Sequence, residues 1–312
     1  GNSPNALKLI DDYGADGVRV GLMLSSAAGN DLLFDANLCD QGKSFSNKIW
    51  NSYRLVSGWK IGNNDQPEYC SNAINWYNHK FNYVLKQIND HFSKFRISNA
   101  LMTTYKLIWD DFCSVLLEII KPEYGKPIDS KTHKEIIKIF ENNLLVLHPF
   151  MPFISEEIWH LITERSSDEA LVISKWPKSN SYINNEIIND FEIIQNIISG
   201  IRNLRKKYQI SFKKSLNLSV VNNDNFTKKY DSVISKLCNI SKIEYNNLEI
   251  KNALTFRNKS NIYSIPYEFD INIDEEIIKI KEDLEYQKGF LNSVTSKLEN
   301  ERFTDNAPDS VV

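Results

Sequence analysis

The sequence predicts a mainly α protein with three parts: an antiparallel helical bundle, a small α+β subdomain and the start of a coiled-coil arm. Three observations support this prediction. Apolar residues recur three and four positions apart through residues 41–165. Short runs that alternate apolar and polar residues follow between 216 and 269, and heptad spacing begins near residue 273. We place the parts at 1–40 (linker region), 41–185 (bundle), 186–270 (α+β) and 271–312 (arm).

Five helical segments make up the predicted bundle. In the first of them, Ile49, Tyr53 and Val56 lie four and three residues apart, so that one face of the helix is apolar. The third stops at Pro122, and Ser155 is the expected N-cap of the fifth. Long amphipathic helices joined by short loops pack as an antiparallel bundle. The segments are 45–56, 74–88, 98–119, 132–147 and 155–162.

Two regions flank this bundle pattern. Before it, the apolar residues of 13–26 mix helical and strand periodicity, so the pattern does not decide between a helix and a strand. After it, an amphipathic helix is predicted over 186–207. The α+β subdomain is predicted to contain strands at 216–221, 243–245 and 262–269 and a helix at 226–238.

The last part carries an apolar seam. From Ile273 to Leu298, apolar residues recur four and three positions apart, with Gln287 at one polar position. This spacing is typical of a coiled-coil helix; the alternative is an amphipathic helix that packs on the body of the protein. We expect a monomer, with self-association through residues 271–301 as a possibility that the seam leaves open.

The composition excludes several classes of protein. With 37 Lys+Arg and 40 Asp+Glu the net charge is −3, so nucleic-acid binding would need local basic patches. No apolar run approaches the roughly 18 residues of a membrane span. The four scattered cysteines contain no Cys-x-x-Cys pair, which argues against a zinc site and for a reducing compartment. We expect a cytoplasmic protein without membrane contact, and the start at Gly1 rather than Met suggests a fragment.

We find no constellation of residues that would support catalysis. The five histidines stand at no metal-ligand spacing from an acidic or cysteine residue. Asp110 and Asp111 are adjacent, and adjacent helical residues point about 100° apart, so they cannot form a shared carboxylate pair. A solvated or capping pair is the expected role. The sequence therefore predicts no catalytic residue, no metal ligand and no cofactor in this chain.

A basic stretch is the first candidate binding site. Residues 202–214 contain six cations and no acid, with Tyr208 and Phe212 between them. Cations interleaved with aromatic rings suit contacts to phosphates and bases. The alternative is a helix C-terminus whose cations meet only the helix dipole and solvent. The candidate residues are Arg202, Arg205, Lys206 and Lys213.

A polar stripe on the first bundle helix is the second candidate. Lys48, Asn51 and either Arg54 or Leu55 lie three and four residues apart, opposite the apolar face. Amide and cationic side chains on one stripe suit the reading of unpaired bases. An ordinary solvated helix face would have a similar pattern.

The sequence resembles the valyl-tRNA synthetase family along nearly its whole length. Its opening residues, Gly1-Asn2-Ser3-Pro4, look like the stretch that directly follows the Lys-Met-Ser-Lys-Ser motif of class I synthetases. The 13–19 segment, Tyr-Gly-Ala-Asp-Gly-Val-Arg, is similar to the segment that comes next in that family. The other landmarks are Gly29–Asp35, Asn47–Asn51, Trp109–Cys113, Leu147–Trp159, Ile201–Arg205 and the terminal residues Lys297, Leu298, Phe303, Ala307 and Pro308.

The resemblance implies a fold and a function. It implies that the bundle is the anticodon-binding domain of a class I synthetase, that residues 1–40 end the catalytic domain, and that the arm leans on the tRNA body. The family's enzymes (EC 6.1.1.9) attach valine to tRNA(Val) with ATP and magnesium. The motifs for that chemistry and for editing do not occur in this sequence, so we expect a chain that binds tRNA without charging it.

The resemblance also assigns roles on the first bundle helix. The basic residues that face anticodon bases in the family fall here on Lys48 and Arg54. The next position is commonly Phe, which can stack on a base, and is Leu55 in this chain. Two alternatives remain: the same region of an isoleucyl- or leucyl-tRNA synthetase, or a helical scaffold that binds proteins through its heptad seam.

Overall fold

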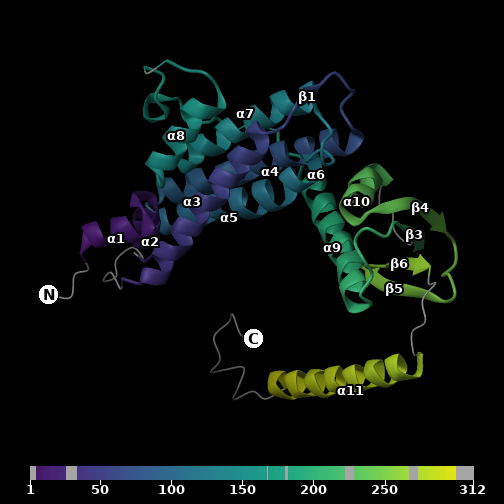
Figure 1. The fold of residues 1–312 in the computed structure, drawn as a ribbon. Helices are drawn as coiled ribbons and strands as arrows, with labels where there is room; N and C mark the ends of the chain where they lie inside the picture. The colour runs from purple at the N-terminus through teal and green to yellow at the C-terminus, as the bar shows by residue number, and fades with distance from the viewer. Residues whose placement is uncertain are drawn as a thin grey trace. The chain divides into compact units, whose positions relative to one another are not determined.

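The computed structural model describes residues 5–25, 34–166, 168–179, 182–221, 228–266 and 273–299. The chain divides into two compact units, Gly1–Ile265 and Pro266–Val312. Figure 1 shows the first unit as a group of helices followed by a small sheet with its own helices. The predicted fold class, mainly α with a small α+β part, is confirmed. The finer division at residues 40 and 185 stays a prediction.

All five helices predicted for the bundle are present. Their bounds are α3 (Ala36–Ser57), α4 (Glu68–Ser93), a long helix in three parts, α7 (Ser130–Leu147) and α8 (Pro152–Ile162). Two short helices precede them, α1 (Ala6–Tyr13) and α2 (Ala15–Ser25), so residues 15–25 of the undecided segment are helical. The expectation of Ser155 as an N-cap was wrong. This residue lies inside α8, where its hydroxyl donates to the Met151 carbonyl at 2.7 Å.

The long helix in three parts changes its winding in the middle. It consists of α5 (Ile97–Lys106), the π-helical segment η1 (Leu107–Leu116) and α6 (Leu117–Ile120). The wider turn is visible where the Ser114 hydroxyl donates to the carbonyl of Trp109, five residues earlier, at 2.8 Å. π-helical insertions are rare and occur often beside functional sites. This one presents Trp109 toward α3, as described below.

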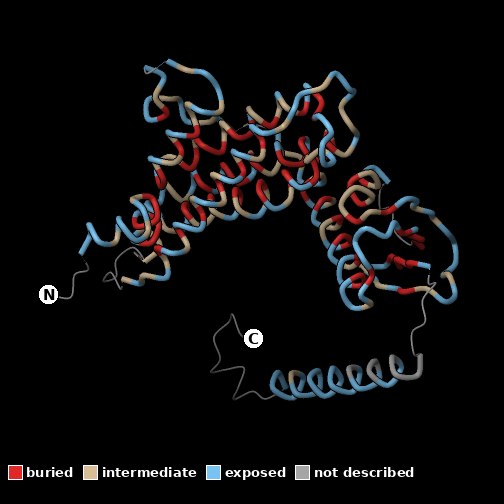
Figure 2. Tube along the Cα trace, viewed as in Figure 1, coloured by how far each residue is buried: buried red, intermediate tan, exposed pale blue. Residues whose placement is uncertain are grey.

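The bundle core lies between α3, α4, η1 and α7. Phe112 on η1 stacks on Phe140 of α7 with ring centroids 5.0 Å apart, and the buried Tyr77 hydroxyl donates to Asn143 at 2.8 Å. Figure 2 shows buried residues along the inward sides of these helices and exposed residues on their outer sides. Paired polar groups and stacked rings give this core a defined packing.

α2 and α3 cross at glycine contacts. A Cβ atom on Gly42 would lie 2.7 Å from the Gly17 carbonyl oxygen, and one on Gly21 would lie 2.4 Å from the Cys39 sulfur. Such distances are shorter than van der Waals contact, so the two backbones approach only because these residues have no side chain. The crossing fixes the first half of α3.

The α+β part is built on α9 (Asn185–Lys207) and a four-stranded sheet of order β4-β3-β6-β5. β3 pairs parallel with β4 and antiparallel with β6. The strands are β3 (Leu216–Val221), β4 (Ile240–Asn246), β5 (Ala253–Asn258) and β6 (Asn261–Pro266), with α10 (Asp231–Cys238) between β3 and β4. The helix at 186–207 and three predicted strands are confirmed within the described residues; β5 was not predicted.

One aromatic contact joins α9 to the bundle. Trp76 of α4 stacks on Phe191 of α9, with centroids 4.1 Å apart and planes 11° from parallel. Both rings are buried, at 2% and 0% exposure. Because aromatic stacking adds to the energy of area burial, this pair is a strong link between the helical and α+β parts of the first unit.

The second unit contains the helix α11 (Ile273–Leu298), which confirms a helix in the predicted arm. Of its seam, Ile277, Leu284 and Leu291 are 42%, 51% and 63% exposed. The ends of the 271–301 segment, residues 271–272 and 300–301, lie outside the described residues. Within the part of the chain that the structure describes, we find no helix that is long and apolar enough to cross a membrane.

Candidate nucleic-acid interface

α3 presents the predicted polar stripe on its outer side. The helix starts after Asp35, whose carboxylate accepts the N–H of Asn37 at 2.9 Å, as an N-cap does. Asn51 and Arg54 are exposed, and Lys48 and Leu55 are half-buried. The structure therefore brings these four residues together on the open part of one helix surface. The buried face consists of Cys39, Gly42, Phe45, Ile49, Ser52 and Val56.

An aromatic wall supports Lys48. Its ammonium lies 5.5 Å from the centroid of the Trp109 ring. That ring is stacked on Tyr105, with centroids 5.4 Å apart, and both rings lie against the buried Phe45. A cation at this distance from an indole is attracted to the ring face. The sequence reasoning used Trp109 only as a landmark and did not predict this support.

A cleft continues the stripe beyond the end of α3. Its volume is about 570 Å³, and Leu55 is the member of the predicted set that lines it. One wall follows α3 and includes Trp59 and Lys60; the other is the 121–126 loop with Tyr124 at its tip. Sequence reasoning missed both aromatic residues. The available signal was Tyr124-Gly125, an aromatic residue in a turn that follows a helix stop.

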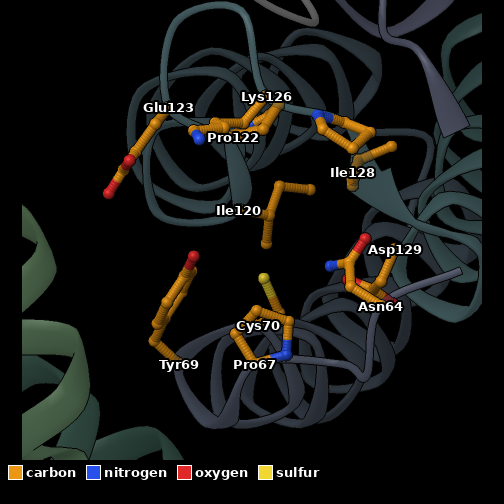
Figure 3. A pocket seen from close by; sticks show the side chains of 11 residues that line it. Asn64, Pro67, Tyr69, Cys70, Ile120, Pro122, Glu123, Lys126, Ile128 and Asp129 are labelled. Atoms are coloured by element: carbon orange, nitrogen blue, oxygen red, sulfur yellow. The ribbon is translucent and has the colours of Figure 1, made fainter. Parts of the chain in front are cut away.

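The inner side of the same loop forms a small hollow. Figure 3 shows Tyr69 and Cys70, at the start of α4, facing Ile120 and the loop. The volume of the hollow is about 170 Å³. Burial raises the pKa of Tyr69 to about 12 and the pKa of Cys70 to about 12. Both groups stay protonated at neutral pH, so the thiol is no nucleophile. We assign this hollow to the packing of the loop.

The second predicted group, on α9 and the turn after it, is only partly exposed. Arg202, Lys206 and Lys213 are exposed, so their charges are open to a ligand. Arg205 is 4% exposed, and its guanidinium donates to the backbone carbonyls of Ser211, at 2.8 Å, Lys214 and Cys238. The prediction of Arg205 as an RNA contact is therefore corrected. It faces inward and holds the turn that carries Lys213.

The two groups lie on different elements. Figure 1 shows α3 and the C-terminal end of α9 in separate places within the first unit. A ligand that touches both groups must reach from one element to the other.

Among the described acidic residues, we find none in a metal site. Among the described residues, no group of three His, Cys, Asp or Glu side chains could hold a metal ion. Asp111 is half-buried on η1, and burial raises its pKa to about 6. The expectation of a solvated or capping pair with Asp110 therefore does not hold for Asp111. Its charged form is disfavoured, and Lys80 opposes the shift only in part.

Comparisons with known proteins indicate the class of protein. Residues 75–221 match the family model for the anticodon-binding domain of tRNA ligase. Over its whole length the chain is 55% identical to the valine--tRNA ligase of Christiangramia forsetii, 45% to that of Phocaeicola vulgatus and 42% to that of Parabacteroides distasonis. The chain spans about a third of the length of these relatives, 35–36%.

A solved structure gives a weaker match. The leucyl-tRNA synthetase of Agrobacterium radiobacter K84, in its complex with tRNA and LeuAMS, aligns with 60% of this chain and 22% of its own, at 17% identity and a TM-score of 0.41. This similarity is too low to bear on the fold or the function.

The match at residues 75–221 and the helical fold define an anticodon-binding protein of the tRNA ligase class. Such a domain binds tRNA. Within this class, the chain belongs to the valine--tRNA ligase family. The alternatives, an isoleucyl or leucyl enzyme or a protein scaffold, are not favoured, because the relatives that cover the whole chain are valine--tRNA ligases.

Proposed function

We propose that this chain holds the anticodon arm of tRNA(Val) for a valine--tRNA ligase and that α3 reads the anticodon bases. The observation that carries the proposal is the stripe of exposed Asn51 and Arg54 with half-buried Lys48, which lies beside the aromatic wall of Trp109. The identity to valine--tRNA ligases over the whole chain supports the choice of tRNA.

The stripe suits unpaired bases. Bases splayed out of a loop expose their Watson–Crick edges, which side-chain amides and cations can bind by hydrogen bonds. Arg54 and Asn51 are exposed donors on one helix, and Asn51 also offers an acceptor. A rigid helix holds these groups in fixed order, so a mismatched base leaves donors unpaired. Discrimination between anticodons follows from that loss.

The exposed cations of α9 have a different role. Arg202, Lys206 and Lys213 contact phosphates, which fix the register of the RNA without reading its sequence. Arg205 supports them from the inside, because it holds the turn of Lys213 through backbone carbonyls. The phosphate contacts make binding dependent on salt, since each one releases counterions.

The complete enzyme joins valine to tRNA(Val) and uses ATP with magnesium. We assign affinity and orientation, rather than bond chemistry, to this chain. We place the protein in the cytoplasm as a monomer, with self-association through the α11 seam as the alternative.

A titration of the chain with tRNA(Val) transcripts tests this proposal. We compare native and swapped anticodons at two salt concentrations. Arg54→Ala should weaken binding of the native transcript by about 1–3 kcal/mol and relax the anticodon preference. Lys206→Ala should weaken binding to both transcripts alike and lower the salt slope by about one.

Two results would contradict the proposal. Equal losses for both variants on both transcripts would remove the base-reading role of α3. Absence of salt-sensitive binding by the unsubstituted chain would remove the RNA-binding role and favour the scaffold alternative.

A further inference from the structure

The cleft beyond α3 has two walls that are fixed to each other. Ile61 and Ile128 pair in a short parallel ladder, β1 (Ile61–Gly62) with β2 (Ile128–Asp129). In addition, the Ile128 N–H donates to the Lys60 carbonyl at 2.8 Å. The wall that follows α3 and the wall that precedes α7 are therefore joined at their base by backbone hydrogen bonds. The cleft is formed before any ligand arrives.

A tight turn presents an aromatic ring at the mouth. The N–H of Lys126 donates to the Glu123 carbonyl at 2.9 Å, and Gly125 has φ 77°. A type II turn requires this positive φ at its third residue, which favours glycine. The turn leaves Tyr124 at 106% exposure. A fully exposed tyrosine on a fixed turn offers a flat face to a ligand without loss of core contacts.

The charges around the cleft favour an anion. Lys60, Lys121 and Lys126 line it, against one carboxylate, Glu123. Lys121 also pairs with Glu118 of α6 at 2.9 Å. Trp59, half-buried, adds a second ring on the α3 side. Rings with surrounding cations are the combination that binds single-stranded nucleotides, because the base stacks while the phosphate meets a positive charge.

We propose that this cleft binds one unpaired nucleotide of the RNA that α3 reads, with the base stacked on Tyr124 and its phosphate near Lys60 and Lys126. The inference rests on the proposed function, because the cleft continues the α3 stripe through Leu55. Leu55 has no ring to stack on a base. The aromatic contact is therefore supplied by the cleft and not by the helix stripe.

Fluorescence titration of the full chain tests the proposal. The probe is an anticodon stem-loop of tRNA(Val) with 2-aminopurine at single loop positions, one position per transcript. Stacking should quench the fluorescence at one position. Tyr124→Ala should abolish the quenching and weaken binding about fivefold or more, whereas Tyr124→Phe should retain both, since the ring is kept. Tyr83→Ala, at an exposed tyrosine of α4 (41% exposed), is the matched control and should change neither.

A charge variant adds a test that misfolding cannot imitate. Glu123→Gln removes the one carboxylate of the cleft and should tighten binding, with a steeper dependence on salt. Binding and quenching by Tyr124→Ala equal to those of the unsubstituted chain, with Arg54→Ala still impaired, would overturn the cleft assignment and leave the proposed function standing. A chain that binds no stem-loop at all would overturn both.

Discussion

The ammonium of Lys48 on α3 lies 5.5 Å from the centroid of the Trp109 ring on η1. Lys48 is therefore restrained by a residue of another helix, although its charge belongs to the proposed reading stripe. Such contacts contribute about 0.5–1 kcal/mol at exposed sites. A lysine held in one place loses less side-chain entropy when it binds a base.

Substitution of the aromatic support should weaken base reading indirectly. We expect Trp109→Leu to reduce affinity for the native anticodon about two- to fivefold, the equivalent of the lost cation–π contact. In a chain that already carries Lys48→Met, the same substitution should change affinity little. A double-mutant cycle on the stem-loop titration measures this coupling. Equal losses in both backgrounds would show that Trp109 does not act through Lys48.

Substitution of Arg205 should lower the stability of the fold more than it weakens the binding of RNA. Arg205→Ala leaves the carbonyls of Ser211, Lys214 and Cys238 without their donor, so we expect the free energy of unfolding to fall by about 2–4 kcal/mol. The exposed neighbour Lys206 is the control, and Lys206→Ala should stay within about 0.5 kcal/mol. Urea denaturation followed by circular dichroism checks both. A stable Arg205→Ala variant with impaired RNA binding would restore the surface role.

Gly42 should not accept even a methyl group. The Cβ of Gly42→Ala would lie 2.7 Å from the carbonyl oxygen of Gly17, which belongs to the backbone and cannot rotate away. We expect a loss of about 1–3 kcal/mol in the free energy of unfolding, because the helices must separate. Gly289 of α11 has no atom within 4 Å of an added Cβ. Gly289→Ala should instead stabilise its helix by about 1 kcal/mol, and thermal melts distinguish the two.

The raised pKa of Asp111 predicts that the stability of the folded protein depends on pH. Its pKa is raised to about 6 by burial in the folded protein, above the ordinary value of 3.8. The folded state therefore binds the proton more tightly, and this contribution to stability is lost as the pH rises from about 4 to about 6. Asp111→Asn should be more stable than the unsubstituted chain at pH 7, by about 1–3 kcal/mol. The difference should shrink toward pH 4. A constant difference across this range would contradict the assignment.

The periodicity of apolar residues was sufficient to predict the helices, because each helix buries one face in a shared core. Ile49 and Val56 are 1% and 0% exposed, as their spacing requires. The same pattern could not locate the start of α8, since Ser155 satisfies its hydroxyl within the helix as easily as at a cap. Nor could it show the π-helical turn of η1, whose residues contact α3, α4 and α7.

The part of the candidate site that lies on a single helix could be predicted from the sequence. The part that is assembled from distant segments of the chain could not. Lys48, Asn51 and Arg54 share a stripe because residues three or four positions apart lie about one helical turn apart on the same face. Arg205 is a basic residue at the same helical spacing as its exposed neighbours, so the sequence alone does not distinguish it from them. It is buried because the chain folds back over it at Ser211 and Cys238. Trp59 and Tyr124 are 65 positions apart in the sequence, so no local pattern could place them on one cleft.

The stacking of Trp76 on Phe191 fixes the position of α9 on the bundle, so the length of α9 sets the position of its far end. Lys206 follows Phe191 by 15 residues, which is about 22 Å of helix at 1.5 Å per residue. The cations at the far end of α9 are thus held at a set distance from the helix on which the stack is anchored. An RNA that touches both α3 and this end is bound at two points of one body, and its second contact forms at a high effective concentration. Neither contact has to be strong alone. Lengthening α9 by one turn would keep every contact residue in the sequence, move its cations by about 5.4 Å, and so reduce the affinity.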